Sequence, residues 1–219
     1  GGRDRAGGGG DGRPSERVIL VPMGRSYRGR GEEDDFDALG GGKPKAKHAR
    51  GAETGTGGVY ELEVVLEGSD PPARRRILVD ADTPLDRLHR ILQIAMGWQD
   101  NHLHQFIGRD ELKYSDAEFE LEWAEDESHY DLRDLAENAG DTFRYEYDFG
   151  DNWAHTVRVE RILAVNEAGE FPACVDGERA CPPEECGGLA GYRKLLGKGA
   201  FDADALDVEA INRQLSELT

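Results

Sequence analysis

Hydrophobic and polar positions alternate with a period of two near the start of the patterned part of the chain. Apolar and aromatic side chains take every second position from Tyr60 to Leu66, with glutamates between most of them. Such alternation is typical of a strand with one buried face. A turn rich in proline and glycine follows at 68–72, and residues 74–79 predict a returning strand.

The spacing changes to that of a helix between Thr83 and Gly97. Apolar side chains recur three and four positions apart, which places them on one buried stripe. These side chains are Leu85, Leu88, Ile91, Leu92, Ala95 and Met96. Thr83 is expected to cap the helix, Pro84 suits its first position, and Gly97 suits its end.

A second pair of alternating segments surrounds a turn at 150–152. Aromatic residues alternate with charged ones over 143–149, and alternation resumes over 153–159. This is the strongest hairpin pattern in the chain. Other predicted elements are short strands at 102–107 and 111–114, an exposed acidic segment at 116–129, and helices at 132–136, 189–196 and 205–218. Because hairpins outnumber parallel crossovers, the predicted fold class is α+β, an antiparallel sheet built from hairpins with helices packed on one face.

Composition divides the chain into two parts. The chain carries 27 Lys and Arg against 45 Asp and Glu, a net charge of −18. Residues 1–57 carry a net +2 and 16 of the 29 glycines, which predicts a disordered glycine-rich leader. Residues 58–219 carry a net −20 and have a common size for one folded domain.

Charge and hydropathy exclude several classes of function. No apolar run approaches the roughly 18 residues of a membrane-spanning helix, and no secretory pattern is visible, so a cytoplasmic location without membrane contact is expected. A domain at −20 repels phosphate, which argues against direct nucleic-acid binding by the folded part. Basic residues of the leader, such as those at 43–47, are the candidates for any such contact.

Histidines and acidic residues near aromatic side chains form the first candidate site. His102 and His104 would share one face of a strand, about 6 to 7 Å apart along the backbone. They could hold a metal ion or shuttle a proton; alternatively, one caps a loop and the other is solvated.

The second hairpin supplies further candidates. Asp148 and Asp151 would either accept N–H bonds of the turn or, with His155, form the polar walls of a pocket. Aromatic residues of that pocket would be Tyr147, Phe149 and Trp153. No serine or cysteine nucleophile stands in a recognisable catalytic context.

Three cysteines, Cys174, Cys181 and Cys186, make an odd number for a disulfide framework. Three thiolates need one more ligand to complete a tetrahedral zinc site, and His155, His102 or His104 could supply it. The alternative is that the cysteines are small buried or idle side chains. Their spacing is not that of a paired Cys-x-x-Cys zinc ribbon.

Several motifs together resemble a known family. They are Tyr60-x-Leu62-x-Val64, residues 88–98, His102-Leu103-His104-x-Phe106, residues 145–155 and residues 181–192. In this order they resemble the Ri-plasmid ORF-3-like family, whose members occur on plasmids and beside insertion-sequence transposases. The resemblance covers roughly residues 58–200. Some members carry a resolvase label, for which this chain shows no serine-recombinase nucleophile surrounded by arginines.

The resemblance implies an α+β domain and no established activity. It also implies a shared polar cluster, which maps onto His102, His104, Asp148, Asp151, His155 and Glu184. The chain departs from the family pattern at Arg74, where a tryptophan is usual, and at Glu185, where an aspartate is usual. Family members without the three cysteines imply that zinc is at most a feature of a subset.

Three functions fit these observations. The favoured one is a non-catalytic binding module that presents its His- and Asp-lined pocket to a partner protein or a small ligand. The second is a metal-dependent hydrolase or nuclease whose ion activates water. Its ligands would be His102, His104, Asp148, Asp151 and His155. The third is a structural domain stabilised by zinc on the cysteines, which is compatible with the first.

Overall fold

The computed structural model describes residues 57–218, so the predicted leader lies outside the described residues except for Gly57. Eight strands form one sheet in the order β5-β4-β3-β6-β7-β1-β2-β8. The strands are β1 (Val59–Leu66), β2 (Arg74–Asp80), β3 (His104–Ile107), β4 (Lys113–Ser115), β5 (Glu125–Asp126), β6 (Thr142–Tyr147), β7 (Trp153–Leu163) and β8 (Ala173–Glu178). All neighbours pair antiparallel except β4 and β5. The predicted α+β fold is confirmed.

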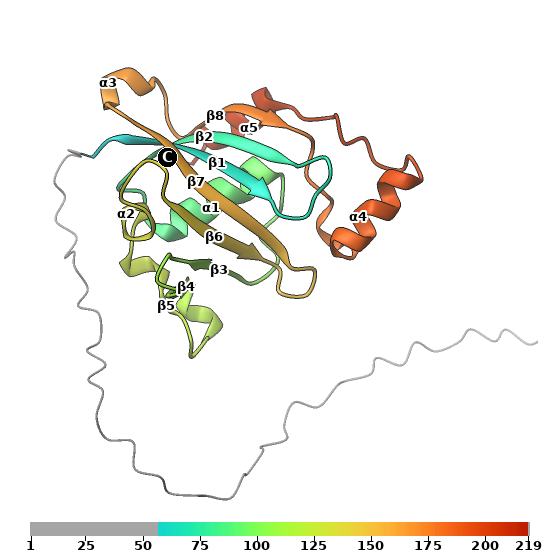
Figure 1. Ribbon diagram of the computed structural model, residues 1–219, viewed down its shortest axis with the longest axis horizontal. Coiled ribbons are helices and arrows are strands. Elements are labelled where there is room, and N and C mark those ends of the chain that lie inside the picture. The colour runs from blue at the N-terminus through green and yellow to red at the C-terminus, as the bar shows by residue number, and fades with distance from the viewer. Residues whose placement is uncertain (1–56, 219) are drawn as a thin grey trace, which may run out of the picture. The chain divides into compact units, whose positions relative to one another are not determined.

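The core lies between the sheet and helix α1 (Leu85–Met96), which crosses the back of the sheet in Figure 1. The predicted apolar stripe of α1 is buried along its whole length. It packs on the inward positions of the strands, where Leu62 of β1 faces Ile77 of β2 and Val159 of β7 across the ladders. Each such aliphatic side chain contributes about 1.5–3 kcal/mol by full burial.

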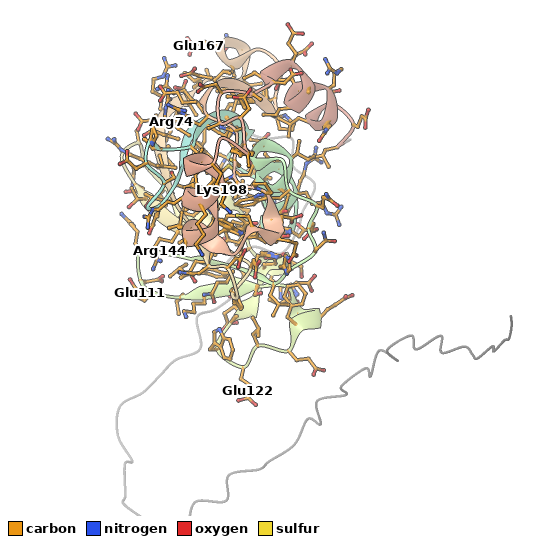
Figure 2. All side chains as sticks on the ribbon, turned by 90° about the vertical axis from the view of Figure 1, so that its right-hand side faces the viewer. Arg74, Glu111, Glu122, Arg144, Glu167 and Lys198 are labelled. Carbon is orange, nitrogen blue, oxygen red and sulfur yellow. The ribbon has the colours of Figure 1, made fainter. Side chains whose placement is uncertain are left out.

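The opposite face of the sheet is mostly polar, which explains the charged half of the alternation; at one end Val59 and Leu78 pack with Ala168 in a small second apolar cluster. Arg74 and Arg144 project from this face (Figure 2). Arg74 donates to Glu178 at 2.7 Å and to Asp176 at 3.1 Å. Such half-exposed ion pairs add little to the free energy of unfolding.

Helix α1 begins differently from the prediction. Pro84 is its N-cap, and the side chain of Thr83 makes no capping hydrogen bond. The backbone here pairs instead with the segment before α2 (Leu132–Leu135). Leu85 N–H donates to Tyr130 O at 3.1 Å, and Leu132 N–H donates to Thr83 O at 2.9 Å. This non-local pairing satisfies the first N–H of α1, which a side-chain cap does not reach here. Gly97 closes the helix with φ at 82°, as predicted.

Remaining helices are short or lie near the C-terminus: α3 (Val165–Ala168), α4 (Gly188–Gly197), α5 (Val208–Leu215), and single turns η1 (Ala117–Phe119), η2 (Glu127–His129) and η3 (Glu184–Cys186). Helix α5 lies against β8 and α1, and α4 stands beyond the β1–β2 turn (Figure 1). None of the helices within residues 57–218 is long and apolar enough to cross a membrane.

Two boundaries differ in ways that affect the candidate site. Strand β3 begins at His104, so His102 lies in the loop before it rather than in the strand. The acidic segment 116–129, predicted to be exposed, places Glu127 inside the molecule with only 3% of its surface accessible. Glu127 is held there by His104, a partner 23 residues away that local pattern does not reveal.

Candidate functional site

The β6–β7 hairpin directs most of its aromatic residues into the core. Tyr147 and Trp153 pair across the hairpin, and both are fully buried, as is His155. Trp98 covers them, stacked on Tyr147 at 5.2 Å and edge-on to His155 at 5.3 Å. Burial lowers the pKa of His155 to about 4, so this ring is neutral at neutral pH. Trp153 and His155 therefore lie in the core, whereas Phe149 is 39% exposed at the turn.

The two aspartates of the hairpin turn bind backbone groups. Asp148 has φ at 55°, and its Oδ1 accepts from Gly150 N–H at 2.9 Å and Asp151 N–H at 3.2 Å. Asp151 Oδ2 accepts from Gly187 N–H at 3.0 Å, which ties the turn to the start of α4. The contacts of Asp148 are those of the turn role that the sequence offered as one alternative, whereas Asp151 accepts from a residue outside the turn.

Glu184 joins three segments at one carboxylate. The Tyr147 hydroxyl donates to its Oε1 at 2.5 Å, and Gln99 N–H donates to the same oxygen at 3.1 Å. Burial raises the pKa of Tyr147, and the hydrogen bond to Glu184 raises it further. Beside this contact, His102 Nε2 lies 2.8 Å from Glu185 Oε1 and 3.7 Å from Asp148 Oδ2. His102 therefore bridges the loop after α1 and the C-terminal region.

The three cysteines are not assembled with His155 into a ligand set. Cys181 Sγ lies 3.2 Å from a nitrogen of the buried Arg75 guanidinium, and burial raises the pKa of this thiol to about 11. Zinc binds the thiolate, so a protonated thiol beside a cation is a poor ligand. Cys174 and Cys186 donate to nearby backbone carbonyls instead. Across residues 57–218, the one group of side chains at metal-ligand spacing contains no cysteine.

That group centres on His89, a buried residue of α1. Its Nδ1 lies 2.8 Å from the Tyr145 hydroxyl, and its Nε2 lies 2.7 Å from Asp100 Oδ1. Gln93 donates to the same hydroxyl at 2.8 Å, so the hydroxyl proton is directed to His89 Nδ1. The ring then carries its own proton on Nε2 and donates it to Asp100. Burial lowers the pKa of His89, which favours this neutral form.

Gln93 also positions Asp100. The side-chain oxygen of Gln93 accepts from Asp100 N–H at 3.0 Å. This hydrogen bond holds Asp100 in a left-handed backbone conformation, with φ at 58°. The hydrogen bond from His89 lowers the pKa of Asp100, so its carboxylate is charged at neutral pH. Helix α1 and the loop that follows it thus build one side of the site from residues a few positions apart.

A second histidine–carboxylate pair lies against the first. His104 Nε2 lies 2.8 Å from Glu127 Oε2, and both side chains are almost fully buried. The rings of His104 and His89 stack at 3.5 Å between centroids, with 6° between their planes. His104 Nδ1 is buried and has no hydrogen-bond partner among the described residues.

These pairs open onto a cleft of about 420 Å³ between α1, the loop before β3 and the segment 116–127. Its lining consists of Asp86, His89, Arg90, Asp100, Asn101, His102, Leu103, His104, Asp116, Phe119 and Glu127. Four carboxylates against one arginine give the cleft a negative charge. Of the predicted site residues, only His102 and His104 line it.

Sequence reasoning missed His89, Asp100 and Glu127. The available signal was a polar residue inside an apolar stripe, because His89 lies four positions after Leu85 and three before Leu92. Asp100 and Glu127 carried no such signal, since acidic residues are frequent throughout the domain.

Comparisons with known proteins match the described domain. A family model described as plasmid pRiA4b ORF-3-like protein matches residues 58–213. The uncharacterized protein y4hQ of Sinorhizobium fredii (strain NBRC 101917 / NGR234) is 36% identical over 186 residues, covering 73% of this chain and 92% of that protein. The crystal structure of MM3350, a protein of unknown function from Methanosarcina mazei Go1, shares 32% identity at a TM-score of 0.61. The match covers 70% of this chain and 97% of the MM3350 chain.

Proposed function

Starting from the fact that the chain belongs to the plasmid pRiA4b ORF-3-like family, whose matched relatives are uncharacterised, we propose that its domain is a binding module without catalytic activity. The ligand is a small positively charged group, either free or presented by a partner protein. It enters the cleft in front of the two stacked histidines.

The charge balance of the cleft is the observation that carries this proposal. Among residues 57–218, the cleft is lined by four carboxylates, those of Asp86, Asp100, Asp116 and Glu127, and by one arginine, Arg90. The cleft volume falls within the range of small-ligand sites, which is about 300–1,000 Å³. Carboxylates already fixed by hydrogen bonds attract a cation without first having to be ordered.

The lining residues also favour binding over chemistry. None of those described is a serine, threonine, cysteine or lysine, so the cleft offers no hydroxyl, thiol or amine nucleophile. The histidines already have carboxylate partners, which hold the rings in place.

A metal-dependent hydrolase is the second candidate, because two histidines and an aspartate stand at metal-ligand spacing. The residues differ from the sequence prediction: His104 is kept, while His102, Asp148, Asp151 and His155 are outside the group. Hydrolysis of a model phosphodiester with added Zn²⁺ or Mn²⁺, lost in Asp100→Asn, would favour this candidate over the binding module.

Binding is tested by titrating the full chain with Zn²⁺ and with a tetra-arginine peptide, using amide NMR shifts and calorimetry. We expect saturable binding of at least one cation, with shifts confined to residues 86–90, 100–104 and 116–127, and no binding of a tetraglutamate peptide. Asp116→Asn should weaken the binding. Glu122→Gln is the matched control, because Glu122 lies at the outer tip of the same segment, away from the cleft (Figure 2). Equal weakening in both variants, or no saturable binding of either cation, would contradict the proposal.

A further inference from the structure

We propose that His89, Asp100 and His104 bind one divalent transition-metal ion, with Glu127 and Tyr145 orienting the two imidazole rings. This inference rests on the proposed function, because it names the class of cation that the cleft takes. It places the metal on two histidines and a carboxylate, His104 among the metal ligands that the sequence suggested, rather than on the cysteines.

The donor atoms are already close together. One ring nitrogen of each histidine and one carboxylate oxygen of Asp100 lie within 4.8 Å of one another. An ion bound at about 2.1 Å in a tetrahedral site holds its donors about 3.4 Å apart. The donors therefore need to approach one another by up to about 1.4 Å to close around an ion.

His104 offers a free donor atom. Its Nε2 is engaged by Glu127 at 2.8 Å, so the ring proton is placed on that nitrogen and the lone pair on Nδ1. Nδ1 is buried and has no hydrogen-bond partner within residues 57–218, and only 2% of the surface of His104 is accessible. An unpaired buried polar atom is unfavourable, and an ion at Nδ1 would satisfy it. Metal-binding histidines usually donate their other N–H to a carboxylate in this way.

His89 has the corresponding support on its other nitrogen. Asp100 lies 2.7 Å from Nε2, and the Tyr145 hydroxyl lies 2.8 Å from Nδ1. When an ion takes Nε2, the ring proton moves to Nδ1, and the Tyr145 hydroxyl turns its own proton away so that its oxygen accepts from the ring.

The stacked rings set a condition on this site. An ion binds near the plane of an imidazole ring, along the nitrogen lone pair. Two parallel rings 3.5 Å apart cannot both meet this requirement for one ion. Metal binding must therefore turn at least one ring out of the stack. The side chain of Asp100 is 49% exposed at the cleft, so its carboxylate is free to move toward the ion.

The donor set indicates which ions fit. Two imidazoles and one carboxylate suit Zn²⁺, Co²⁺, Fe²⁺ or Ni²⁺, whereas Mg²⁺ and Ca²⁺ prefer all-oxygen sites. Three protein donors leave coordination positions for water or for a donor atom of a partner. Those positions would face the cleft.

The test uses the full chain, freed of metal with a chelator and titrated with Zn²⁺ by calorimetry and with Co²⁺ by visible absorption. We expect one ion per chain and no response to Mg²⁺. Asp100→Asn should weaken binding about 10-fold or more, because it removes a charged ligand. His129→Ala is the matched control: His129 is outside both the cleft lining and the donor group and should leave the affinity unchanged.

Side-chain nitrogen NMR supplies a readout that does not depend on affinity. The nitrogens of His89 and His104 should shift on Zn²⁺ addition, while those of the buried His155 should not. Urea unfolding of Asp100→Asn checks that the variant is folded.

Absence of stoichiometric binding would overturn the metal site, as would equal affinities of Asp100→Asn and the unaltered chain. Loss of binding in Cys186→Ser but not in Asp100→Asn would also overturn it and return zinc to the cysteines. Tetra-arginine binding without metal binding would reject the metal site alone, whereas failure of both cations would reject the proposed function as well.

Discussion

Replacing Tyr145 with phenylalanine removes one buried hydroxyl and leaves the packing of the ring intact. This hydroxyl accepts from Gln93 and donates to His89, each at 2.8 Å. His89 and Gln93 are only 4% and 3% exposed, so solvent does not readily replace the lost partner. Each buried polar group left unpaired costs about 1–3 kcal/mol. We expect Tyr145→Phe to lower the free energy of unfolding by about 2–4 kcal/mol.

Urea denaturation of the full chain, followed by circular dichroism at pH 7, measures this loss. Tyr114→Phe is the matched control, because Tyr114 is also buried but packs against Tyr130 and makes no hydrogen bond within residues 57–218 through its hydroxyl. The control should change the free energy of unfolding by less than about 0.5 kcal/mol. A similar loss in both variants would refute the reasoning that the Tyr145 hydroxyl organises the site.

Three further perturbations test the surrounding structure. The pKa of His155 is about 4 in the folded chain against 6.5 unfolded, so only the unfolded state takes up a proton between these values. The free energy of unfolding should therefore fall by up to about 3 kcal/mol as the pH falls from 6.5 toward 4. Urea titrations at several pH values should show a smaller fall for His155→Gln. Gly191→Ala would place a Cβ 1.6 Å from Cys186 O, whereas a Cβ at Gly197 meets nothing within 4 Å. Thermal unfolding should show a loss of about 1–3 kcal/mol for the first and no loss for Gly197→Ala; equal effects would reject the close contact. The guanidinium of Arg75 donates to four backbone carbonyls, so Arg75→Lys should cost at least about 3 kcal/mol in urea, and a cost below about 1 kcal/mol would contradict this role.

Most of the fold could be predicted because its signals are local. The alternation in β1 and in the β6–β7 hairpin follows from one buried face of a sheet, and the stripe of α1 follows from one buried face of a helix. Thr83 failed as a cap because the first turn of α1 pairs with residues near Asp131, a contact between distant parts of the chain.

The site was harder to predict because its pairs join distant segments. His104 meets Glu127 across 23 residues, and His89 meets Tyr145 across 56. The hairpin pattern itself held a clue against His155 as a pocket wall: it occupies the same face as Trp153 and Val157, which are core positions.

The central claim is that the cleft in front of His89 and His104 binds a cation. Calorimetric titration of the full chain and of Asp100→Asn with Zn²⁺ and with tetra-arginine tests it most directly. We predict saturable binding of at least one of these cations, at one site per chain, weakened about 10-fold or more in the variant. No saturable binding of either cation, or binding that Asp100→Asn leaves unchanged, would contradict the claim.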